Sequence, residues 1–250
     1  MSKIITCPHC HNEFTDEPLE ELLKPTLTIS RRQLERGSWQ DIADLVDRGE
    51  AYRMLSVGDS ISCALKGGSN VTIDVLDINP YGNDEVIFGF RDSFIDWQMN
   101  QTNTNAGGFP KSKMLADIEK SIIPLLPDDL LSVITPRLIQ QDIRNSRSEI
   151  PAKLWLPSLY EVFGDYKEYC CDVGERQYQF FKEPRNRIKL KRDGKTSVFW
   201  WLRSPYVSYS TGFWLVSNYG NTYDYSAVNS FGVCPCFAIC KKDIKVLIAQ

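Results

Sequence analysis

The segment Tyr206–Cys240 reads YVSYSTGFWLVSNYGNTYDYSAVNSFGVCPCFAIC, and its composition differs from that of everything before it. It contains no Lys, Arg, Glu, Gln or Met, although these five types make up roughly a fifth of the 250 residues. Tyr, Ser and Asn stand in their place. An ordinary solvated strand, polar on its outer face, would mix in Lys, Glu and Thr. The composition is instead typical of a recognition surface, where Tyr supplies rigid contact area and Ser and Asn supply adaptable hydrogen bonds.

We therefore predict that the exposed side chains of this segment bind a ligand. The predicted ligand-binding residues are Tyr206, Ser208, Tyr209, Ser210, Thr211, Asn218, Tyr219, Asn221, Tyr223, Asp224, Tyr225, Asn229, Ser230 and Phe231. A genetic mechanism could explain why Lys, Glu, Gln and Met are missing from the segment. Codons that end in a pyrimidine and vary at their first two positions cannot encode Lys, Glu, Gln, Met or Trp. Scaffold positions are then Trp214, Leu215, Gly220, Ala227, Gly232 and Pro235.

The part of the chain before this segment predicts alternating helices and strands. A helix is expected over Ser38–Arg48, capped by Ser38 and Asp41 and ended by Gly49. Strands are expected over 60–65, 71–76 and 85–90, the first two as a hairpin. In the second strand Val71, Ile73 and Val75 alternate with Thr72 and Asp74, which indicates a half-buried sheet.

Further along, residues 99–110 predict an irregular loop, pinned by the side chains of Asn103 and Asn105. Helices are expected over 111–123, after Pro127, and over 157–163, the last opened by proline and closed by Gly164. The basic run 182–195 predicts a solvated hairpin, with a phosphate-binding patch as the alternative. Arg203 is interpreted as a partly buried guanidinium that binds backbone carbonyls.

Histidine and cysteine usage limits the chemistry that the chain can perform. The only histidines are His9 and His11, which excludes Ser-His-Asp and Cys-His arrangements from the main body, and we expect no enzymatic activity. Cys7 and Cys10 form half of a zinc-ribbon pattern, so residues 1–37 are predicted to be a half zinc knuckle and a linker. A structural zinc there is the only cofactor considered. Most of the eight cysteines are expected to be buried free thiols.

Four motifs in order carry a resemblance to a known family: MNQTNTNAGGFPKSKM (99–114), LPSLYEVFG (156–164), WWLRSPY (200–206) and GVCPCFAI (232–239). Over roughly residues 38–240 the chain resembles bacterial and prophage proteins with the DUF6273 domain. These are similar to the C-type-lectin-like variable proteins of diversity-generating retroelements.

This resemblance implies an α+β, C-type-lectin-like domain over 38–250 with a twisted antiparallel sheet. Trp200, Trp201 and Leu202 would anchor the C-terminal strands in the core. A reverse transcriptase would rewrite codons within 207–211, 217–219, 221–226 and 229–231. The chain departs from the family pattern at Cys234, where an arginine is usual, and in its N-terminal half knuckle.

The predicted function is binding of a protein or glycan ligand through residues 206–231. Two alternatives stay open: an oxidase resembling the sulfatase-modifying enzymes, which would use Cys236 and Cys240, and a structural phage subunit. The net charge of −3 gives no reason to expect a nucleic-acid partner. No membrane span or signal peptide is recognised, so we expect cytoplasmic synthesis, with association in an oligomer or a phage particle as a further expectation.

Overall fold

The computed structural model describes residues 38–78, 85–164, 171–172 and 176–242, together with the backbone of 4–6 and 13–15. The chain divides into two compact units, Met1–Arg31 and Arg32–Gln250. In the first unit β1 (Ile4–Thr6) pairs with β2 (Glu13–Thr15) in antiparallel orientation. The predicted zinc ligands Cys7 and Cys10 lie outside the described residues.

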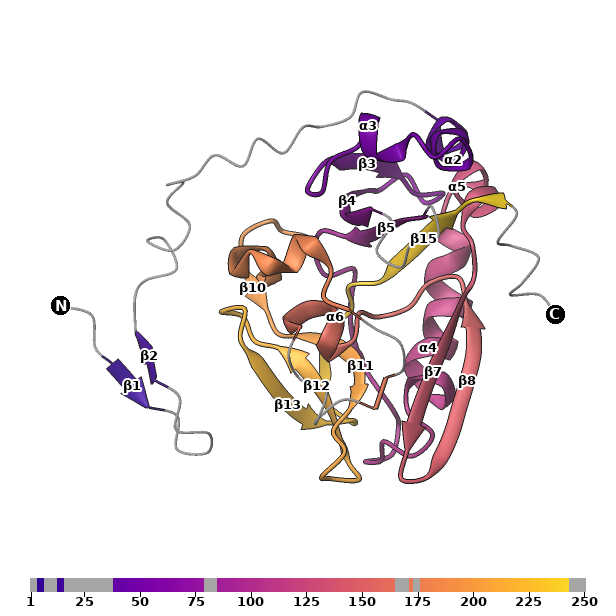
Figure 1. Cartoon of the computed structure of the whole chain (residues 1–250). Helices are drawn as coiled ribbons and strands as arrows, with labels where there is room; N and C mark the ends of the chain where they lie inside the picture. The colour runs from indigo at the N-terminus through magenta and orange to yellow at the C-terminus, as the bar shows by residue number, and fades with distance from the viewer. Residues whose placement is uncertain are drawn as a thin grey trace. The chain divides into compact units, whose positions relative to one another are not determined.

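The second unit is an α+β domain, as predicted, and its first sheet joins the beginning of the domain to its end (Figure 1). This antiparallel sheet has the order β15-β5-β4-β3. Its strands are β3 (Ser60–Ala64), β4 (Asn70–Ile78), β5 (Glu85–Phe90) and β15 (Cys236–Cys240). The three predicted N-terminal strands and the hairpin of β3 and β4 are therefore confirmed.

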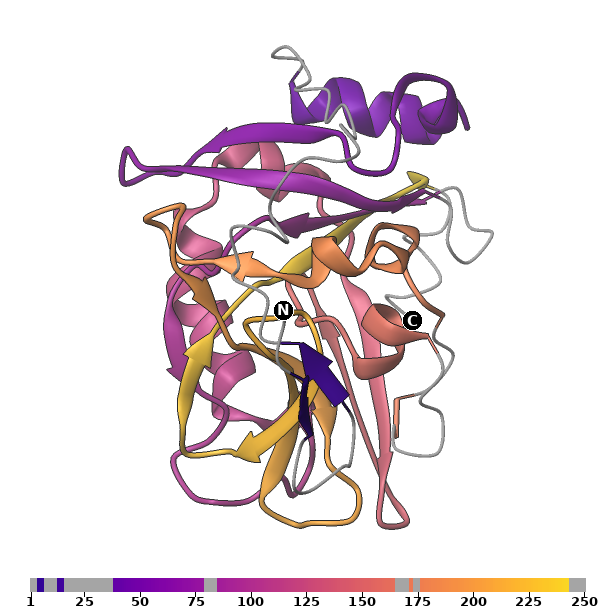
Figure 2. The ribbon, with the colours of Figure 1, turned by 90° about the vertical axis from the view of Figure 1, so that its left-hand side faces the viewer.

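The helix α2 (Trp39–Asp47) lies over this sheet in Figure 2 and is followed by the short α3 (Ala51–Met54). Ser38 and Asp41 form the predicted capping box, and Gly49 has the positive φ that ends the helix. The rings of Trp39 and Phe88 meet edge to face at 5.6 Å. The helix is thus held by its buried stripe against the sheet.

The half-buried pattern predicted for β4 is wrong at Asp74. Its side chain is fully buried and forms an ion pair with Arg91, whose Nη2 lies 2.5 Å from Oδ1. Both faces of β4 are covered in this part of the sheet, because Val75, Leu76 and Asp77 are also buried. Asp74 and Asp77 of β4 therefore form buried ion pairs and do not belong to a face in contact with solvent.

The second sheet is mixed and carries the C-terminal segment. Its strand order is β13-β12-β11-β14-β6, and only β11 and β14 pair in parallel. The strands are β6 (Asp96–Gln98), β11 (Trp200–Pro205), β12 (Gly212–Val216), β13 (Thr222–Ser226) and β14 (Ser230–Gly232). Trp200, Trp201 and Leu202 are fully buried, which agrees with the anchoring that the resemblance implied.

Helical segments connect the two sheets and differ in detail from the prediction. They are η1 (Phe109–Lys111), α4 (Lys113–Asp117), a π turn (Ile118–Ile122), a 3-10 turn (Ile123–Leu125), α5 (Asp128–Val133) and α6 (Leu159–Phe163). The helix expected from Lys111 begins at Lys113, because Ser112 caps it. Likewise Ser158, and not Pro157, opens α6, through a capping box with Glu161.

Two hairpins complete the domain. The hairpin of β7 (Arg137–Ile143) and β8 (Ser146–Ala152) was not predicted, although its turn residues Arg144 and Asn145 have the positive φ angles of a two-residue hairpin turn. After η5 (Gln179–Lys182) and η6 (Pro184–Arg187), β9 (Lys189–Leu190) pairs with β10 (Ser197–Val198).

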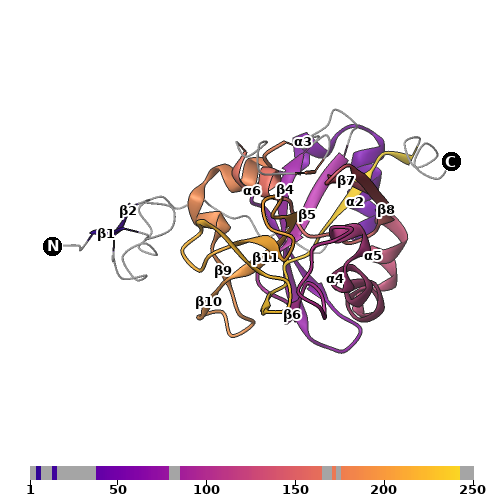
Figure 3. The ribbon, with the colours of Figure 1, turned by 90° about the horizontal axis from the view of Figure 1, so that it is seen from below.

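The basic run 182–195 is a hairpin only in part, because it includes η6 and β9 while the second strand, β10, begins after it, and Lys189 corrects the solvated interpretation. Lys189 is buried, and its Nζ donates to Phe90 O at 3.0 Å. The helix α4 and this hairpin lie on opposite sides of β11 (Figures 1 and 3). No helix in the described part of the chain is long and apolar enough to cross a membrane.

Candidate ligand-binding surface

Four of the predicted tyrosines are exposed on the second sheet and its loops. Tyr209, Tyr219, Tyr223 and Tyr225 are 62%, 56%, 46% and 42% exposed. Large aromatic side chains normally bury most of their area, so four such tyrosines within seventeen residues stand out as contact area that the fold leaves uncovered. Ser208, Ser210, Asn221 and Ser230 are exposed as well.

One group of these side chains forms what we call the aromatic face, made of Phe199, Tyr223, Tyr225 and Phe231. Tyr223 and Tyr225 stack along β13 with ring centroids 6.4 Å apart. Tyr225 meets Phe231 at 5.2 Å, and Tyr223 meets Phe199 at 5.9 Å. Alternate residues of a strand point to one side, which places both tyrosines on the same face.

A second group lies on the opposite face of the same hairpin. Trp214 and Asp224 are cross-strand partners in β12 and β13, one residue out of phase with the two tyrosines of the aromatic face. Tyr206 meets Trp214 at 4.8 Å and Tyr209 at 5.1 Å. The predicted residues are thus distributed over two faces of one hairpin and do not form a single flat surface.

The turn between β12 and β13 presents a third group, which includes Asn218, Tyr219 and Asn221. The Ser217 hydroxyl accepts hydrogen bonds from the N–H groups of Tyr219 and Asn221, at 3.4 Å and 3.1 Å. Gly220 has φ +82°, and a Cβ there would lie 3.2 Å from Pro184 O. Only glycine fits this position without strain, which agrees with its predicted role in the scaffold.

The loop 99–105 holds the segment by its backbone. The Asn105 amide donates to the carbonyl oxygens of Tyr206, Tyr209 and Gly212 at 2.8–3.0 Å. Asn105 is fully buried, and Arg144 in turn donates to its Oδ1. The prediction that Asn105 pins backbone is confirmed, although the backbone belongs to residues 206–212. Asn103 is exposed.

Two further contacts, from the last residue of β6 and from the loop that follows it, reach the residues just after β13. Gln98 donates through its side chain to Val228 O, and the Asn100 N–H donates to Ala227 O. The acceptor in each of these hydrogen bonds is a backbone carbonyl oxygen. The bond therefore does not depend on the side chain of the accepting residue. The hairpin conformation is therefore fixed by groups that remain unchanged when the exposed side chains are replaced.

The buried side chains of the segment form its scaffold, and Phe213 and Leu215 among them lie on the same sheet face as Tyr225 and Tyr223, because cross-strand partners in an antiparallel pair point to one side. Phe213 and Leu215, the cross-strand partners of Tyr225 and Tyr223, are fully buried, as are Ala227 and Val233. A Cβ on Gly232 would lie 2.8 Å from Ser93 Oγ. The scaffold assignments of Leu215, Gly220, Ala227 and Gly232 agree with these positions.

Sequence analysis missed Phe199 as a member of the surface. It precedes the compositionally distinct segment and belongs to an aromatic run that includes the buried Trp200 and Trp201. The signal that could have found it is the alternation that leads into β11, because Phe199 immediately precedes this strand and its ring, like that of Trp201, meets Phe231.

Arg203 lies behind the surface in a buried network of charges. Its Nη1 donates to Leu156 O at 2.8 Å and to Glu161 Oε2 at 2.6 Å, and its Nε donates to Asp172 Oδ1 at 3.1 Å. Burial alone would raise the pKa of Glu161, but the positive charges of Arg203 and Arg137 lower it. The predicted carbonyl contact is present. Arg203 is, however, fully buried, and its main partners are carboxylates.

The cysteines of the described residues are buried. Cys63, Cys171, Cys234, Cys236 and Cys240 are free thiols, which agrees with the prediction for these positions. Cys236 and Cys240 occupy the two ends of β15, so about 13 Å of extended strand separates them. Burial raises the pKa of Cys240 to about 12 and that of Cys236 also rises well above its usual value. Reactive thiols have a pKa below the usual value and are partly exposed to solvent.

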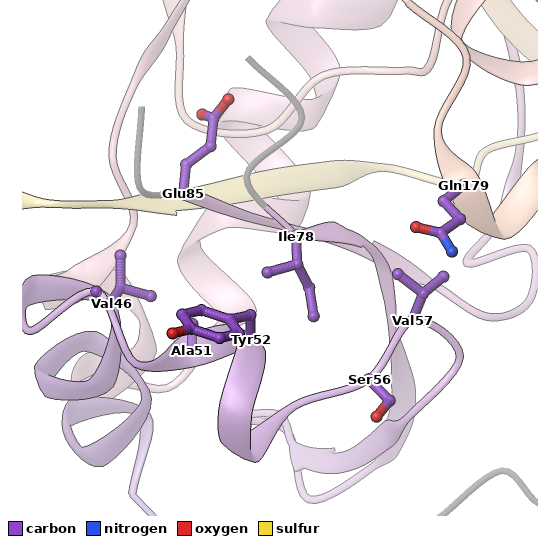
Figure 4. Close-up of a pocket in the computed structure, with 9 residues that line it drawn as sticks. Val46, Ala51, Tyr52, Ser56, Val57, Ile78, Glu85 and Gln179 are labelled. Atoms are coloured by element: carbon purple, nitrogen blue, oxygen red, sulfur yellow. The ribbon is translucent and has the colours of Figure 1, made fainter. Parts of the chain in front are cut away.

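A cavity of about 630 Å³ lies beside α3, and no residue of 206–231 lines it (Figure 4). Val46, Tyr52, Val57, Ile78 and Gln179 are among the residues that line it. None of the predicted ligand-binding residues contributes to it. Among the described residues no three His, Cys, Asp or Glu side chains cluster as a metal site would require.

Comparison with known proteins gives one match. Neither the curated proteins nor the solved structures contain a chain that matches this one. A family model described as a domain of unknown function, DUF6273, matches residues 85–241, from the start of β5 to just beyond β15. This range includes the whole second sheet and more than half of the chain. The chain therefore belongs to the DUF6273 family.

Proposed function

We propose that this protein binds a macromolecular ligand through the exposed side chains of residues 206–231, without catalysis. The observation that carries the proposal is the exposure of Tyr209, Tyr219, Tyr223 and Tyr225 on β13 and the loops beside β12, where the backbone is anchored from outside the segment. Exposed aromatic side chains supply most of the binding free energy in protein interfaces, and small polar neighbours supply orientation.

The backbone anchors also support diversification of this surface. Asn105, Asn100 and Gln98 hold carbonyl oxygens, which every amino acid provides. A change of side chain at Ser208, Tyr209 or Tyr223 leaves these bonds in place. We propose that the exposed positions vary among related proteins while the scaffold positions stay fixed, as retroelement-directed mutagenesis would require.

We further propose that the fold is C-type-lectin-like. The support for this assignment is topological: the last strand, β15, returns to the sheet of β3, β4 and β5, and the second sheet lies between them in sequence. The segment 206–231 runs from the end of β11 to β14 of this second sheet. The oxidase alternative gains no support from Cys236 and Cys240, whose burial and separation oppose joint redox chemistry.

Binding is tested with arrays of purified bacterial envelope proteins and of glycans. The key variant carries four substitutions, Tyr209→Ser, Tyr219→Ser, Tyr223→Ser and Tyr225→Ser. Tyr52→Ser is the matched control, because Tyr52 is 64% exposed but lies on α3. We expect the wild type and the control to bind the same array members, and the quadruple variant to lose at least about ten-fold in affinity.

Retention of binding by the quadruple variant would contradict the proposal, and so would a wild-type protein that binds nothing on either array. The diversification proposal has a separate test in the DNA downstream of the gene. We expect a near-copy of the codons for residues 206–240 that differs only at adenines, followed by a reverse transcriptase gene. Its absence would remove the proposed mechanism of diversification and leave the binding proposal standing.

A further inference from the structure

The strand β13 forms an open edge of the second sheet. It pairs with β12 through all five of its residues, and it is the terminal strand in the order β13-β12-β11-β14-β6 (Figure 1). The opposite edge of this sheet, β6, has only three residues. An edge strand exposes a row of backbone N–H and C=O groups to which another strand can add.

The hydrogen bonds that flank the β12–β13 ladder identify these groups. Ser217 N–H donates to Asn221 O, and Ala227 N–H donates to Thr211 O. Odd-numbered residues of β13 therefore turn their backbone groups toward β12, and even-numbered residues turn theirs away. The N–H and C=O groups of Thr222 and Asp224 face the free edge, and they have no hydrogen-bond partner among the residues that the structure describes.

This edge lacks the features by which proteins block strand addition, namely proline and dense charge. The edge strand β8 has them, since it contains Pro151 and the charged residues Arg147 and Glu149. In β13 the only charged residue is Asp224, and there is no proline. The same chain thus protects one edge and leaves another open, next to the exposed tyrosines.

Asp224 itself indicates what the edge would accept. Its side chain is half-buried on the face of Trp214, and no ion pair to it exists among the described residues. Burial raises the pKa of this carboxyl above its usual value. A partly desolvated carboxylate without a cation gains free energy when a Lys or Arg side chain comes next to it.

We propose that β13 is the docking edge for an extended segment of a partner protein, which adds to the sheet as a sixth strand and places Lys or Arg opposite Asp224. Apolar side chains on either side of that cation lie against Tyr223 and Tyr225 and extend the aromatic face. The inference rests on the proposed binding function and narrows its ligand to a protein. Strand addition supplies affinity through the main chain and specificity through alternate side chains.

A second copy of this chain is a poorer occupant of the edge. Residues 206–240 contain no Lys or Arg, so a second β13 offers Asp224 no cation. Pairing centred on Asp224 would also place two carboxylates directly opposite each other, which destabilises a sheet. In analytical ultracentrifugation we therefore expect Asp224→Pro to leave the oligomeric state of the free protein unchanged. A wild-type dimer that Asp224→Pro dissociates would overturn the proposal.

The probe is the capped peptide acetyl-Ser-Thr-Val-Lys-Val-Thr-Ser-amide, titrated into the full-length ¹⁵N-labelled protein. Its sequence offers a lysine flanked by apolar residues in either strand direction. We expect backbone shifts along β13 and amide exchange at Thr222 and Asp224 slowed by about ten-fold at saturation. No change in exchange at these two amides would overturn the proposal.

Two controls separate the main chain from the charge. Asp224→Pro removes an edge N–H that the β12 ladder does not use, so it is expected to abolish binding, whereas Asp224→Asn is expected to weaken it by about five-fold. If Asp224→Pro fails to fold, the intact protein is tested with a peptide that is N-methylated at the backbone nitrogens of the lysine and of the valine after it, which removes the N–H that would bond Asp224 O in antiparallel and in parallel addition, and this peptide must not bind. Equal binding of the methylated peptide would contradict strand addition.

The outcome can be distinguished from failure of the proposed function. Suppose that an array target binds the Asp224→Pro protein as well as the wild type but does not bind the quadruple tyrosine variant. This result would support the recognition function and overturn strand addition. A target that the quadruple variant still binds contradicts the recognition function itself.

Discussion

Asn105 is the residue on which the shape of the candidate surface most depends. One buried amide binds three carbonyl oxygens of the β11–β12 loop, and its own oxygen accepts a hydrogen bond from Arg144. The loop has no regular structure of its own between Tyr206 and Thr211. A single side chain therefore substitutes for the ladder hydrogen bonds that an irregular backbone cannot form.

We predict that Asn105→Ala lowers the free energy of unfolding by about 1–3 kcal/mol, because it leaves buried carbonyl groups unsatisfied. Urea denaturation measures this difference. Asn103→Ala is the matched control, since Asn103 is exposed in the same loop, and it should change stability by less than about 0.5 kcal/mol. Equal effects of the two substitutions would show that the amide of Asn105 does not hold the loop.

At the scale of elements, the parallel contact between β11 and β14 joins the variable segment to the core. Trp200 and Gly232 are paired across it, and Gly232 N–H donates to Phe199 O. β14 follows the edge strand β13 in the chain but pairs on the other side of β11. β14 therefore packs so closely beside β11 that there is almost no space for a side chain at Gly232.

We predict that Gly232→Ala lowers the free energy of unfolding by about 1–3 kcal/mol through overpacking, because the new Cβ would lie 2.8 Å from Ser93 Oγ and 3.1 Å from Phe199 O. Gly67→Ala is the control in the β3–β4 turn, where a Cβ meets nothing within 4 Å. Thermal denaturation of both variants tests the difference. A Gly232→Ala protein as stable as the control would mean that β14 can move aside at little cost.

Across the described part of the molecule the thiols are buried, whereas the tyrosines of the candidate surface are exposed. Three of the buried thiols lie on the first sheet, Cys234 follows β14, and Cys171 precedes Asp172 of the Arg203 network, whereas the exposed tyrosines lie on β13 and in the two loops that flank β12. Burial raises the pKa of Cys63 to about 11, and those of Cys234 and Cys240 to about 12. At neutral pH these thiols stay protonated and are poor nucleophiles.

We predict that the five buried thiols do not react with Ellman's reagent in the native protein and react fully in denaturant. The measurement uses the Cys7→Ser, Cys10→Ser and Cys170→Ser triple variant, so that only the five described thiols report. Rapid native reaction of two thiols, removed by Cys236→Ser and Cys240→Ser, would favour the oxidase alternative. The rate under native conditions also reports how often the core opens.

Local sequence signals were sufficient for several elements. The capping box of Ser38 and Asp41 and the hairpin of β3 and β4 follow from nearest-neighbour chemistry, and the structure confirms them. The β7–β8 hairpin was missed because its alternation is irregular, with Leu138 exposed at 48% and Gln141 fully buried. Asp74 was misjudged for a related reason, since the cation that permits its burial, Arg91, lies on another segment.

The composition of residues 206–231 by itself determined which side chains are candidates for binding, because exclusion of whole residue types is a property of the sequence and needs no coordinates. Only the tertiary structure decided that these side chains divide between two faces of a hairpin, that Phe199 joins them, and that β13 has an open edge. The physical reason is that faces and edges are set by strand register and by long-range contacts such as those of Asn105, and pairing across a hundred residues leaves no local trace in the sequence.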